Sequence, residues 1–171
     1  MAHPQFREDD LMAMRVGFGY DIHRTVMGRR LVLGGITFAT DWGLDGHSDA
    51  DVLAHAVGDA LLGAAGLGDL GQHFPPADPR WRDISSIELL KMIRAMLDGA
   101  NATIVNVDAT VVARAPMIGP VRGTMCANLA RAIKVGNGQV SVKATTNESL
   151  DSLGRGEGIA AWAAALVEIR E

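Results

Sequence analysis

The chain has 171 residues, of which 48% are apolar, 21% charged and 5% aromatic, and at this length a single domain buries a hydrophobic core of its own. Its net charge of −4 excludes the concentrated basic surface that binds nucleic acid, and its one cysteine excludes an internal disulfide framework. No apolar run approaches the roughly 20 residues that cross a bilayer. The first residues show neither a signal-peptide pattern nor a Ser- and Arg-rich leader, so we expect a soluble protein of the bacterial cytoplasm, with no nucleic-acid or membrane partner.

The chain begins with a polar segment and then a strand. Residues 1–13 are polar and aperiodic, which predicts a disordered extension or a vector remnant, followed by a single domain over 14–171. From residue 15 onward the side chains alternate with the period of two that is typical of a strand. One face carries Gly17, Gly19, Asp21 and His23, and the other carries Val16, Phe18, Tyr20 and Ile22. The side chains of Tyr20 and Ile22 are apolar enough to lie in the core.

A hairpin and a helix follow this strand. Residues 31–38 contain the pair Gly34-Gly35, which favours a bulged hairpin or a bent edge strand. Ser48, followed three residues later by Asp51, resembles a capping box at the start of an Ala- and Leu-rich helix over 52–65.

The second half of the chain alternates helices and strands. Ser85 and Glu88 predict the start of a second helix, whose apolar stripe carries Leu90, Ile93 and Leu97. The next predicted elements are a strand over 102–113, a helix over 119–135, a strand over 139–145 and a flexible turn over 154–158. The alanine-rich segment 159–169 suits either a helix or a strand. Interleaved strands and helices indicate an α/β (α+β) domain.

Three residues form a candidate metal site. Asp21 and His23 are two apart on a strand, so their side chains project from the same face and offer an oxygen and an imidazole nitrogen. His55 lies on the helix over 52–65, where Asp51 or Asp59 could accept the proton of its second ring nitrogen. Three protein ligands leave a fourth position open, the pattern of a catalytic zinc site. The alternatives are a solvated polar strand face for Asp21 and His23, and an ordinary core histidine for His55.

Two further segments are candidate phosphate sites. Gly46-His47-Ser48 precedes the helix over 52–65, where backbone N–H groups and the helix dipole favour an anion, although Ser48 could simply cap the helix. The cluster over 143–148 ends a strand with one cation, two hydroxyls and a carboxylate, which suits phosphate together with a hard metal ion or an ordinary polar strand end. Arg155, between two glycines, is either an anion ligand or the partner of Glu157 in a salt bridge.

In order and spacing these residues resemble the 2-C-methyl-D-erythritol 2,4-cyclodiphosphate synthases of the non-mevalonate isoprenoid pathway. The resemblance covers nearly the whole chain from residue 15 to residue 169. The motifs that carry it are Arg15-Val16-Gly17-Phe18-Gly19-Tyr20-Asp21-Ile22-His23, His47-Ser48-Asp49-Ala50-Asp51-Val52 with His55, Gly68-Asp69-Leu70-Gly71, Phe74-Pro75, Ala113-Arg114-Ala115-Pro116, Val142-Lys143-Ala144-Thr145-Thr146-Asn147-Glu148 and Gly154-Arg155-Gly156-Glu157-Gly158.

The resemblance implies a particular architecture. Each subunit would contain a mixed four-stranded sheet with helices on one face and a small hairpin, and residues 159–169 would form a strand. Three subunits would assemble as a homotrimer with their sheets around a threefold axis. Each active site would lie between two subunits.

The resemblance also assigns metal-binding and catalytic residues. Zn²⁺ would be held by Asp21, His23 and His55, which is the ligand set that the spacing indicates. Glu148 would help to hold a second ion, Mg²⁺ or Mn²⁺, on the diphosphate of the substrate. His47 and Thr146 would stabilise the transition state.

The implied substrate contacts fall into four groups. Asp69, Leu70 and Gly71 would contact the ribose. The cytosine would be read, largely through backbone atoms, by the loop Ala113, Arg114, Ala115, Pro116, Met117, Ile118 and Gly119. A flexible loop would cover the methylerythritol and consists of Phe74, Pro75, Pro76, Ala77 and Asp78. The remaining contacts would come from Ile22, Ser48, Thr145, Asn147, Ser152 and Arg155, together with the metal ligands and catalytic residues.

The implied reaction is that of a phosphorus–oxygen lyase acting on a cytidine diphosphate substrate, 4-diphosphocytidyl-2-C-methyl-D-erythritol 2-phosphate. An oxygen of the 2-phosphate attacks the β-phosphorus, CMP leaves, and 2-C-methyl-D-erythritol 2,4-cyclodiphosphate forms. Because the substrate carries its own nucleophile, no activated Ser or Cys is required, and catalysis consists of positioning and charge stabilisation.

Several positions depart from the family pattern. Ser152 stands where an aromatic residue is often found, and Pro76 where an acidic residue is often found. Met117 and Gly119 alter the cytosine loop. The family also implies an isoprenoid diphosphate at the threefold axis, but Phe18 replaces a histidine that is common there, which weighs against this ligand.

Two other functions compete with the synthase. A zinc-assisted phosphohydrolase would use the same metal to activate water and would release inorganic phosphate. A trimeric nucleotide- or isoprenoid-binding module would keep the fold without turnover, although it would have no need of an open metal site.

Overall fold

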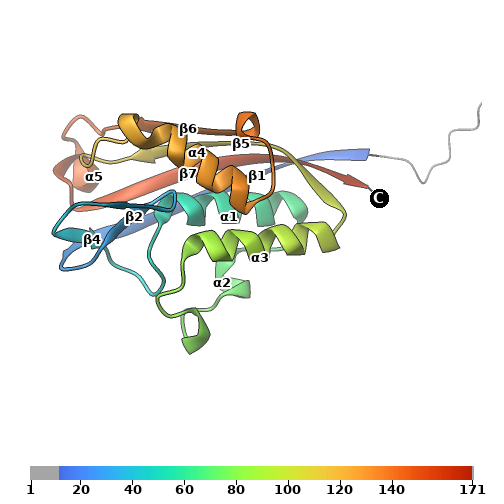
Figure 1. Ribbon diagram of the computed structural model, residues 1–171, viewed down its shortest axis with the longest axis horizontal. Coiled ribbons are helices and arrows are strands. Elements are labelled where there is room, and N and C mark those ends of the chain that lie inside the picture. Colours follow the sequence, from blue (N-terminus) through green and yellow to red (C-terminus); the bar gives the residue numbers. More distant parts are fainter. Residues whose placement is uncertain (1–11, 171) are drawn as a thin grey trace, which may run out of the picture.

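Two long antiparallel strands, β1 (Met12–Met27) and β7 (Gly158–Arg170), form the middle of the sheet (Figure 1). The computed structural model describes residues 12–170. On the far side of β7 lies β5 (Ala102–Val112), antiparallel to it, and β6 (Val140–Thr145) runs parallel to β5 at the edge. The alanine-rich last segment is therefore a strand, as the resemblance implies.

The mixed sheet has five strands, in the order β4-β1-β7-β5-β6, and the expectation of four is wrong. The additional strand is β4 (Trp42–Leu44), which pairs with Thr25–Met27 at the end of β1. A strand of three residues is too short to show an alternating pattern, so only its pairing with β1 identifies it.

The predicted hairpin is confirmed. Strands β2 (Leu31–Leu33) and β3 (Ile36–Phe38) pair with each other as a separate two-stranded sheet. The two residues that join them, Gly34 and Gly35, have positive φ values of 56° and 69°, which other residues rarely adopt.

Three helices and the sheet enclose the core (Figure 1). Helix α1 (Val52–Ala65) packs on β1 and β7, α3 (Ser86–Gly99) packs on α1, and α4 (Arg122–Ala132) packs on β6. Leu90, Ile93 and Leu97 on α3 are fully buried, as their spacing predicts. The last of the predicted helices, over 119–135, is shorter than expected, with a 3-10 turn at Gly119–Val121 before α4.

Two glycines allow α1 to lie unusually close to β1. A Cβ atom on Gly17 would stand 1.9 Å from the carbonyl oxygen of Ala60, and one on Gly19 would stand 2.0 Å from that of Ala56. No side chain fits at such distances, so the absence of a Cβ atom sets the separation between this helix and this strand.

The opposite face of β1 is exposed. Val16 is 73% exposed, Phe18 66%, Tyr20 44% and Ile22 44%, so the expectation that Tyr20 and Ile22 lie in the core is wrong. Because side chains alternate along a strand, the glycine face of β1 turns toward α1 and the apolar face turns away from it. Within residues 12–170 of the single chain, no element covers this apolar face.

Other segments differ in detail from the sequence prediction. The expected turn over 154–158 is partly helical, since α5 (Asp151–Arg155) includes its first two residues. The carboxylate of Asp151 accepts hydrogen bonds from the N–H groups of Leu153 and Gly154, which supports this short helix. A second short helix, α2 (Leu70–His73), and two 3-10 turns, Pro79–Trp81 and Asn137–Gln139, complete the fold.

The expected N-terminal extension lies mostly outside the described residues, which begin at Met12. Met12 and Ala13 already belong to β1 and pair with Arg170 and Ile169 of β7. Between residues 12 and 170, no helix is long and apolar enough to cross a membrane.

Candidate metal centre and active-site cavity

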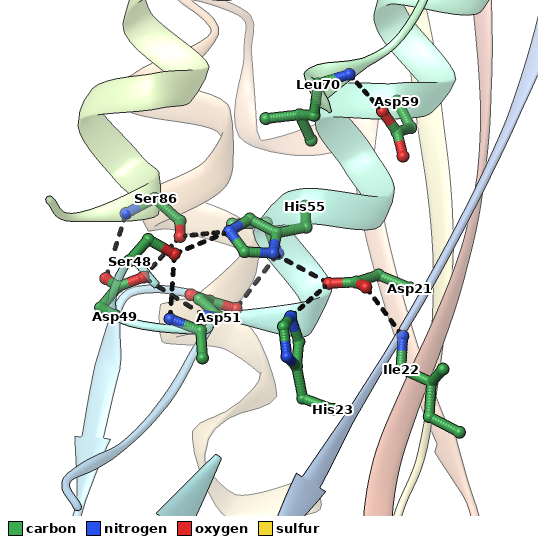
Figure 2. Close-up of polar contacts among 12 residues, drawn as sticks. Asp21, Ile22, His23, Ser48, Asp49, Asp51, His55, Asp59, Leu70 and Ser86 are labelled. Atoms are coloured by element: carbon green, nitrogen blue, oxygen red, sulfur yellow. Dashed lines mark hydrogen bonds and ion pairs between the residues drawn. The ribbon is translucent and has the colours of Figure 1, made fainter. Parts of the chain in front are cut away.

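The close contact of α1 with β1 brings the three predicted metal ligands together. Asp21 and His23 project from the glycine face of β1, and His55 projects from the first turns of α1 (Figure 2). One oxygen or nitrogen atom from each of these three side chains lies within 4.8 Å of the other two. The predicted grouping is confirmed as a candidate site.

The three side chains already contact one another through the atoms that would bind a metal. Oδ2 of Asp21 lies 3.0 Å from Nε2 of His23 and 2.8 Å from Nδ1 of His55. The other nitrogen of His23, Nδ1, lies 2.5 Å from the carbonyl oxygen of Asp45, to which it donates a hydrogen bond. This bond leaves Nε2 of His23 as the nitrogen that faces the cluster.

The electrostatics of the cluster favour a carboxylate between two imidazoles. Burial opposes ionisation of Asp21, but hydrogen bonds and charge from His23 and His55 outweigh it and hold the pKa of Asp21 well below its usual range. Burial also opposes protonation of His23, but the hydrogen bond and charge of Asp21 outweigh it and raise the pKa of His23. Asp21 is therefore an anionic ligand that attracts a cation to this point.

The second nitrogen of His55 does not contact either carboxylate that the sequence indicates. Asp51 is the N-cap of α1, where its side chain accepts hydrogen bonds from the N–H groups of Ala54, Gly34 and Gly35. Asp59 accepts a hydrogen bond from the N–H group of Leu70, and burial raises the pKa of Asp59.

Two hydroxyl groups take the place that the sequence gives to Asp51 or Asp59. Nε2 of His55 lies 2.9 Å from Oγ of Ser86 and 3.1 Å from Oγ of Ser48 (Figure 2). The expectation that Asp51 or Asp59 accepts from His55 is therefore wrong, because both carboxylates already serve backbone N–H groups. Ser86, at the start of α3, is a site residue that sequence reasoning missed.

The segment before α1 is held in place by Arg29. Its guanidinium donates hydrogen bonds to the carbonyl oxygens of Gly46, at 2.7 Å, and Ser48, at 2.9 Å. The N–H group of Ala54, in the first turn of α1, is capped by the carboxylate of Asp51 rather than by Ser48, so a carboxylate of the chain already lies at the start of this helix.

A cavity of about 230 Å³ opens beside the three metal ligands. Nine of the predicted site residues line it: Asp21, His23, His47, Ser48, His55, Leu70, Gly71, Phe74 and Pro76. Sequence reasoning missed three lining residues, Asp59, Trp81 and Leu89, as parts of a cavity. Nε2 of His47 and Nε1 of Trp81 are buried and have no hydrogen-bond partner among the described residues.

The remaining predicted residues do not line this cavity. They are Ile22, Asp69, Pro75, Ala77 and Asp78, the loop Ala113–Gly119 and the group Thr145, Thr146, Asn147, Glu148, Ser152 and Arg155. Thr146 is exposed and donates a hydrogen bond of 2.9 Å to Glu148. Arg155 forms a salt bridge of 2.6 Å with Glu157, which is one of the two roles that the sequence allows for this arginine. The described residues thus bring together the three candidate metal ligands and the cavity beside them.

Comparisons with known proteins agree with this geometry. Residues 14–168 match the YgbB family. The chain is 56% identical, over 90% of its length and 92% of the relative's, to a 2-C-methyl-D-erythritol 2,4-cyclodiphosphate synthase of Desulfosudis oleivorans. It is 57% identical, over 91% of its length and 100% of the relative's, to a protein of the same name from Desulfatibacillum aliphaticivorans.

Solved structures have the same fold. The bifunctional IspDF of Campylobacter jejuni superposes with a TM-score of 0.89 at 35% identity, over 93% of this chain and 43% of that one. The CDP complex of Plasmodium falciparum IspF superposes with a TM-score of 0.80 at 31% identity, over 92% of this chain and 97% of that one.

Proposed function

This chain belongs to the YgbB family, and from that membership we propose that it closes 4-diphosphocytidyl-2-C-methyl-D-erythritol 2-phosphate into 2-C-methyl-D-erythritol 2,4-cyclodiphosphate and releases CMP. The activity is that of a phosphorus–oxygen lyase of isoprenoid biosynthesis. The structural observation that carries the proposal is the cluster of Asp21, His23 and His55 on the wall of a cavity. The relatives are bacterial proteins, which supports a bacterial source for this chain.

The donor set of this cluster suits Zn²⁺. One carboxylate and two imidazoles are ligands that zinc prefers, and three of them leave a position for a phosphate oxygen. Nδ1 of His23 donates to a carbonyl oxygen and Nε2 of His55 faces hydroxyl groups, the usual surroundings of metal-bound imidazoles. Zinc held here would supply a Lewis acid and orient the β-phosphate of the substrate.

The chain itself would position the substrate and stabilise negative charge. The reacting 2-phosphate and β-phosphate belong to one molecule, so holding its two ends against each other removes most of the entropic cost of their encounter. His47, which lines the cavity, would donate to the developing charge. Thr146 would donate from the other side, and Glu148 beside it would hold Mg²⁺ or Mn²⁺ on the diphosphate.

We propose that the complete site forms between two copies of the chain in a homotrimer. Thr146 and the loop Ala113–Gly119 do not line the cavity of their own chain, so a neighbouring copy is the natural source of these groups. The exposed apolar residues of β1, among them Val16 and Phe18, form a surface that assembly around a threefold axis would bury.

Product analysis tests the reaction. Purified protein loaded with Zn²⁺ and Mg²⁺ is given the diphosphocytidyl substrate, and phosphorus NMR follows the products. We expect CMP and a cyclic diphosphate in equal amounts. Release of inorganic phosphate would instead support the phosphohydrolase, and binding without turnover would support the nucleotide-binding module.

The His55→Ala variant tests the role of the metal centre. We expect it to lose bound zinc and turnover while its oligomeric state is unchanged, because His55 does not lie on the exposed apolar face of β1. Zinc content, turnover and sedimentation are measured on the same preparation. Full turnover of zinc-free protein would contradict the proposed mechanism.

A further inference from the structure

We propose that Ser86 and Asp49 are positioning residues of the metal centre, which keep the ring proton of His55 on Nε2 and so present the lone pair of Nδ1 to the metal. The inference rests on the proposed zinc site. It concerns two residues outside the ligand set, one at the start of α3 and the other in the segment that precedes α1 (Figure 2).

A continuous chain of hydrogen bonds links Asp49 to His55. The hydroxyl of Ser86 donates to Oδ1 of Asp49, and the backbone N–H of Ser86 donates to Oδ2 of the same carboxylate at 3.1 Å. Oγ of Ser86 lies 2.9 Å from Nε2 of His55. Ser86 is only 1% exposed, so these contacts form where water competes little.

Counting protons along this chain determines the tautomer of His55. A serine hydroxyl has one proton, and in Ser86 that proton is directed to the carboxylate of Asp49. Oγ of Ser86 therefore offers a lone pair to Nε2 of His55, and Nε2 must carry a proton to form a hydrogen bond with it. With its proton held on Nε2, the ring can present the lone pair of Nδ1, the atom that lies 2.8 Å from Oδ2 of Asp21, to a metal ion bound between the two side chains.

Ser48 cannot fix the tautomer in the same way. Its Oγ lies 3.1 Å from Nε2 of His55 and accepts a hydrogen bond from the N–H group of Ala50. No carboxylate contacts the hydroxyl of Ser48 among the described residues, so this hydroxyl can either donate to His55 or accept from it. Only the pair of Ser86 and Asp49 gives the ring a single allowed tautomer.

The test measures zinc affinity in variants of this pair. Metal-free protein is titrated with Zn²⁺ against a chromogenic chelator at constant pH, after circular dichroism has shown that each variant is folded. We expect Ser86→Ala and Asp49→Asn to bind zinc about 10- to 100-fold more weakly than the parent, the usual effect of removing a group that orients a metal ligand.

Two features make this comparison specific. Asp49→Asn keeps the side-chain volume but replaces one acceptor oxygen by an NH₂ donor, which must face either the hydroxyl or the N–H of Ser86. Ser85→Ala is the matched control, because Ser85 is the neighbouring serine, is exposed and makes no side-chain cap hydrogen bond. Its zinc affinity is expected to equal that of the parent.

A spectroscopic readout separates positioning from general loss of stability. In Co²⁺-substituted protein, we expect the visible absorption bands to change in Ser86→Ala and Asp49→Asn and to stay unchanged in Ser85→Ala. The inference would be overturned if both variants had the zinc affinity and the Co²⁺ spectrum of the parent. If Ser86→Ala does not fold, the result for Asp49→Asn alone tests the inference. If His55→Ala still binds zinc as the parent does, the proposed zinc site is wrong, and this result would contradict the proposed function as well as the inference.

Discussion

Two histidines of the same candidate centre are oriented by different kinds of group. Nδ1 of His23 is held by a backbone carbonyl oxygen, that of Asp45, which no substitution removes. Nε2 of His55 is held by side-chain hydroxyls, which a single substitution can remove. The orientation of His55 is therefore the more sensitive of the two to mutation.

The carboxylate of Asp21 stabilises the metal-free protein only over a limited pH range. The pKa of Asp21 is lowered, so its contribution is present above the ordinary aspartate pKa of about 3.9 and is lost as the pH falls. The pKa of His23 is raised, so its contribution is full below the ordinary histidine pKa of about 6.5 and is lost as the pH rises through the raised value. The pair stabilises most between these two limits.

We therefore expect Asp21→Asn to destabilise metal-free protein most at about pH 5 to 6, and less as the pH rises above the pKa of His23. Urea unfolding of parent and variant at a series of pH values measures this difference in the free energy of unfolding. Glu88→Gln, which removes an exposed ion pair with Lys91, is the control and should show a small difference at every pH. A constant difference for Asp21→Asn would contradict the prediction.

At the scale of secondary-structure elements, the site depends on how closely one helix approaches one strand. His55 reaches Asp21 because α1 lies directly against the backbone of β1 at Gly17 and Gly19. Neither glycine contacts a ligand or contributes a donor atom to the cluster. Because neither glycine has a Cβ atom, α1 can approach β1 closely enough for His55 to reach Asp21.

We expect Gly19→Ala to lower the free energy of unfolding by about 3 kcal/mol or more, since its Cβ atom would stand 2.0 Å from the carbonyl oxygen of Ala56 and force α1 away from β1. Zinc affinity should fall in the same variant. Gly63→Ala is the matched control, because it lies in α1 with nothing within 4 Å of its Cβ position. Better helix propensity should make that variant more stable by about 0.5 to 1 kcal/mol.

Denaturant unfolding and zinc titration of both alanine variants provide the measurement. An unchanged stability and zinc affinity in Gly19→Ala would show that α1 can shift without cost, contrary to the close packing of the two elements.

At the scale of the whole molecule, the sheet has one covered and one uncovered face. Alternation along β1 places glycines and the candidate metal ligands under α1 and places Val16, Phe18, Tyr20 and Ile22 on the exposed face. The ring of Tyr20 also packs against that of Trp162 on β7, with centroids 4.9 Å apart. An apolar surface of this kind is typical of a subunit interface.

We expect Phe18→Asp to dissociate the oligomer and to reduce turnover severely, because it would place a charge in the proposed interface. Sedimentation velocity and the turnover assay are run on the same sample. Met92→Asp, a similar change at an exposed methionine of α3, should remain assembled and active. An assembled and active Phe18→Asp protein would place the interface elsewhere.

A second whole-molecule prediction concerns sites shared between copies. His55→Ala and Thr146→Ala should each be inactive, because the two variants remove groups that lie on opposite sides of the proposed site. Refolding the two variants together in equal amounts should restore about a quarter of the parental activity. Random mixing gives about a quarter of the sites both an intact His55 from one copy and an intact Thr146 from the neighbouring copy.

Parental and singly mutated proteins refolded in the same way are the controls for the mixture. No recovery on mixing would mean that both groups act within one chain.

Sequence patterns predicted local structure well where the pattern was long. The period of two in β1, the helix over 52–65 and the buried stripe of α3 were all readable, because each repeats its signal over several turns or residue pairs. The three-residue strand β4 and the partly helical turn at α5 were missed, because each depends on a contact with another segment or side chain rather than on a repeat.

The residues of the candidate site also fall into a group that the sequence could predict and a group that it could not. The candidate ligands Asp21, His23 and His55 could be named from their chemical types and spacing. The partners of His55 could not, because Ser86 lies 31 residues further along the chain and reaches the ring only when α3 packs on α1.

The amino-acid sequence by itself determined which residues can bind a metal, which strand face is apolar, and the resemblance to a family of synthases. Only the tertiary structure decided that the apolar face of β1 is exposed, that Asp51 and Asp59 serve the backbone, and that Ser86 links Asp49 to His55. The physical reason is that local periodicity specifies which residues share a face, whereas the neighbour of each face depends on packing between segments that are far apart in the chain.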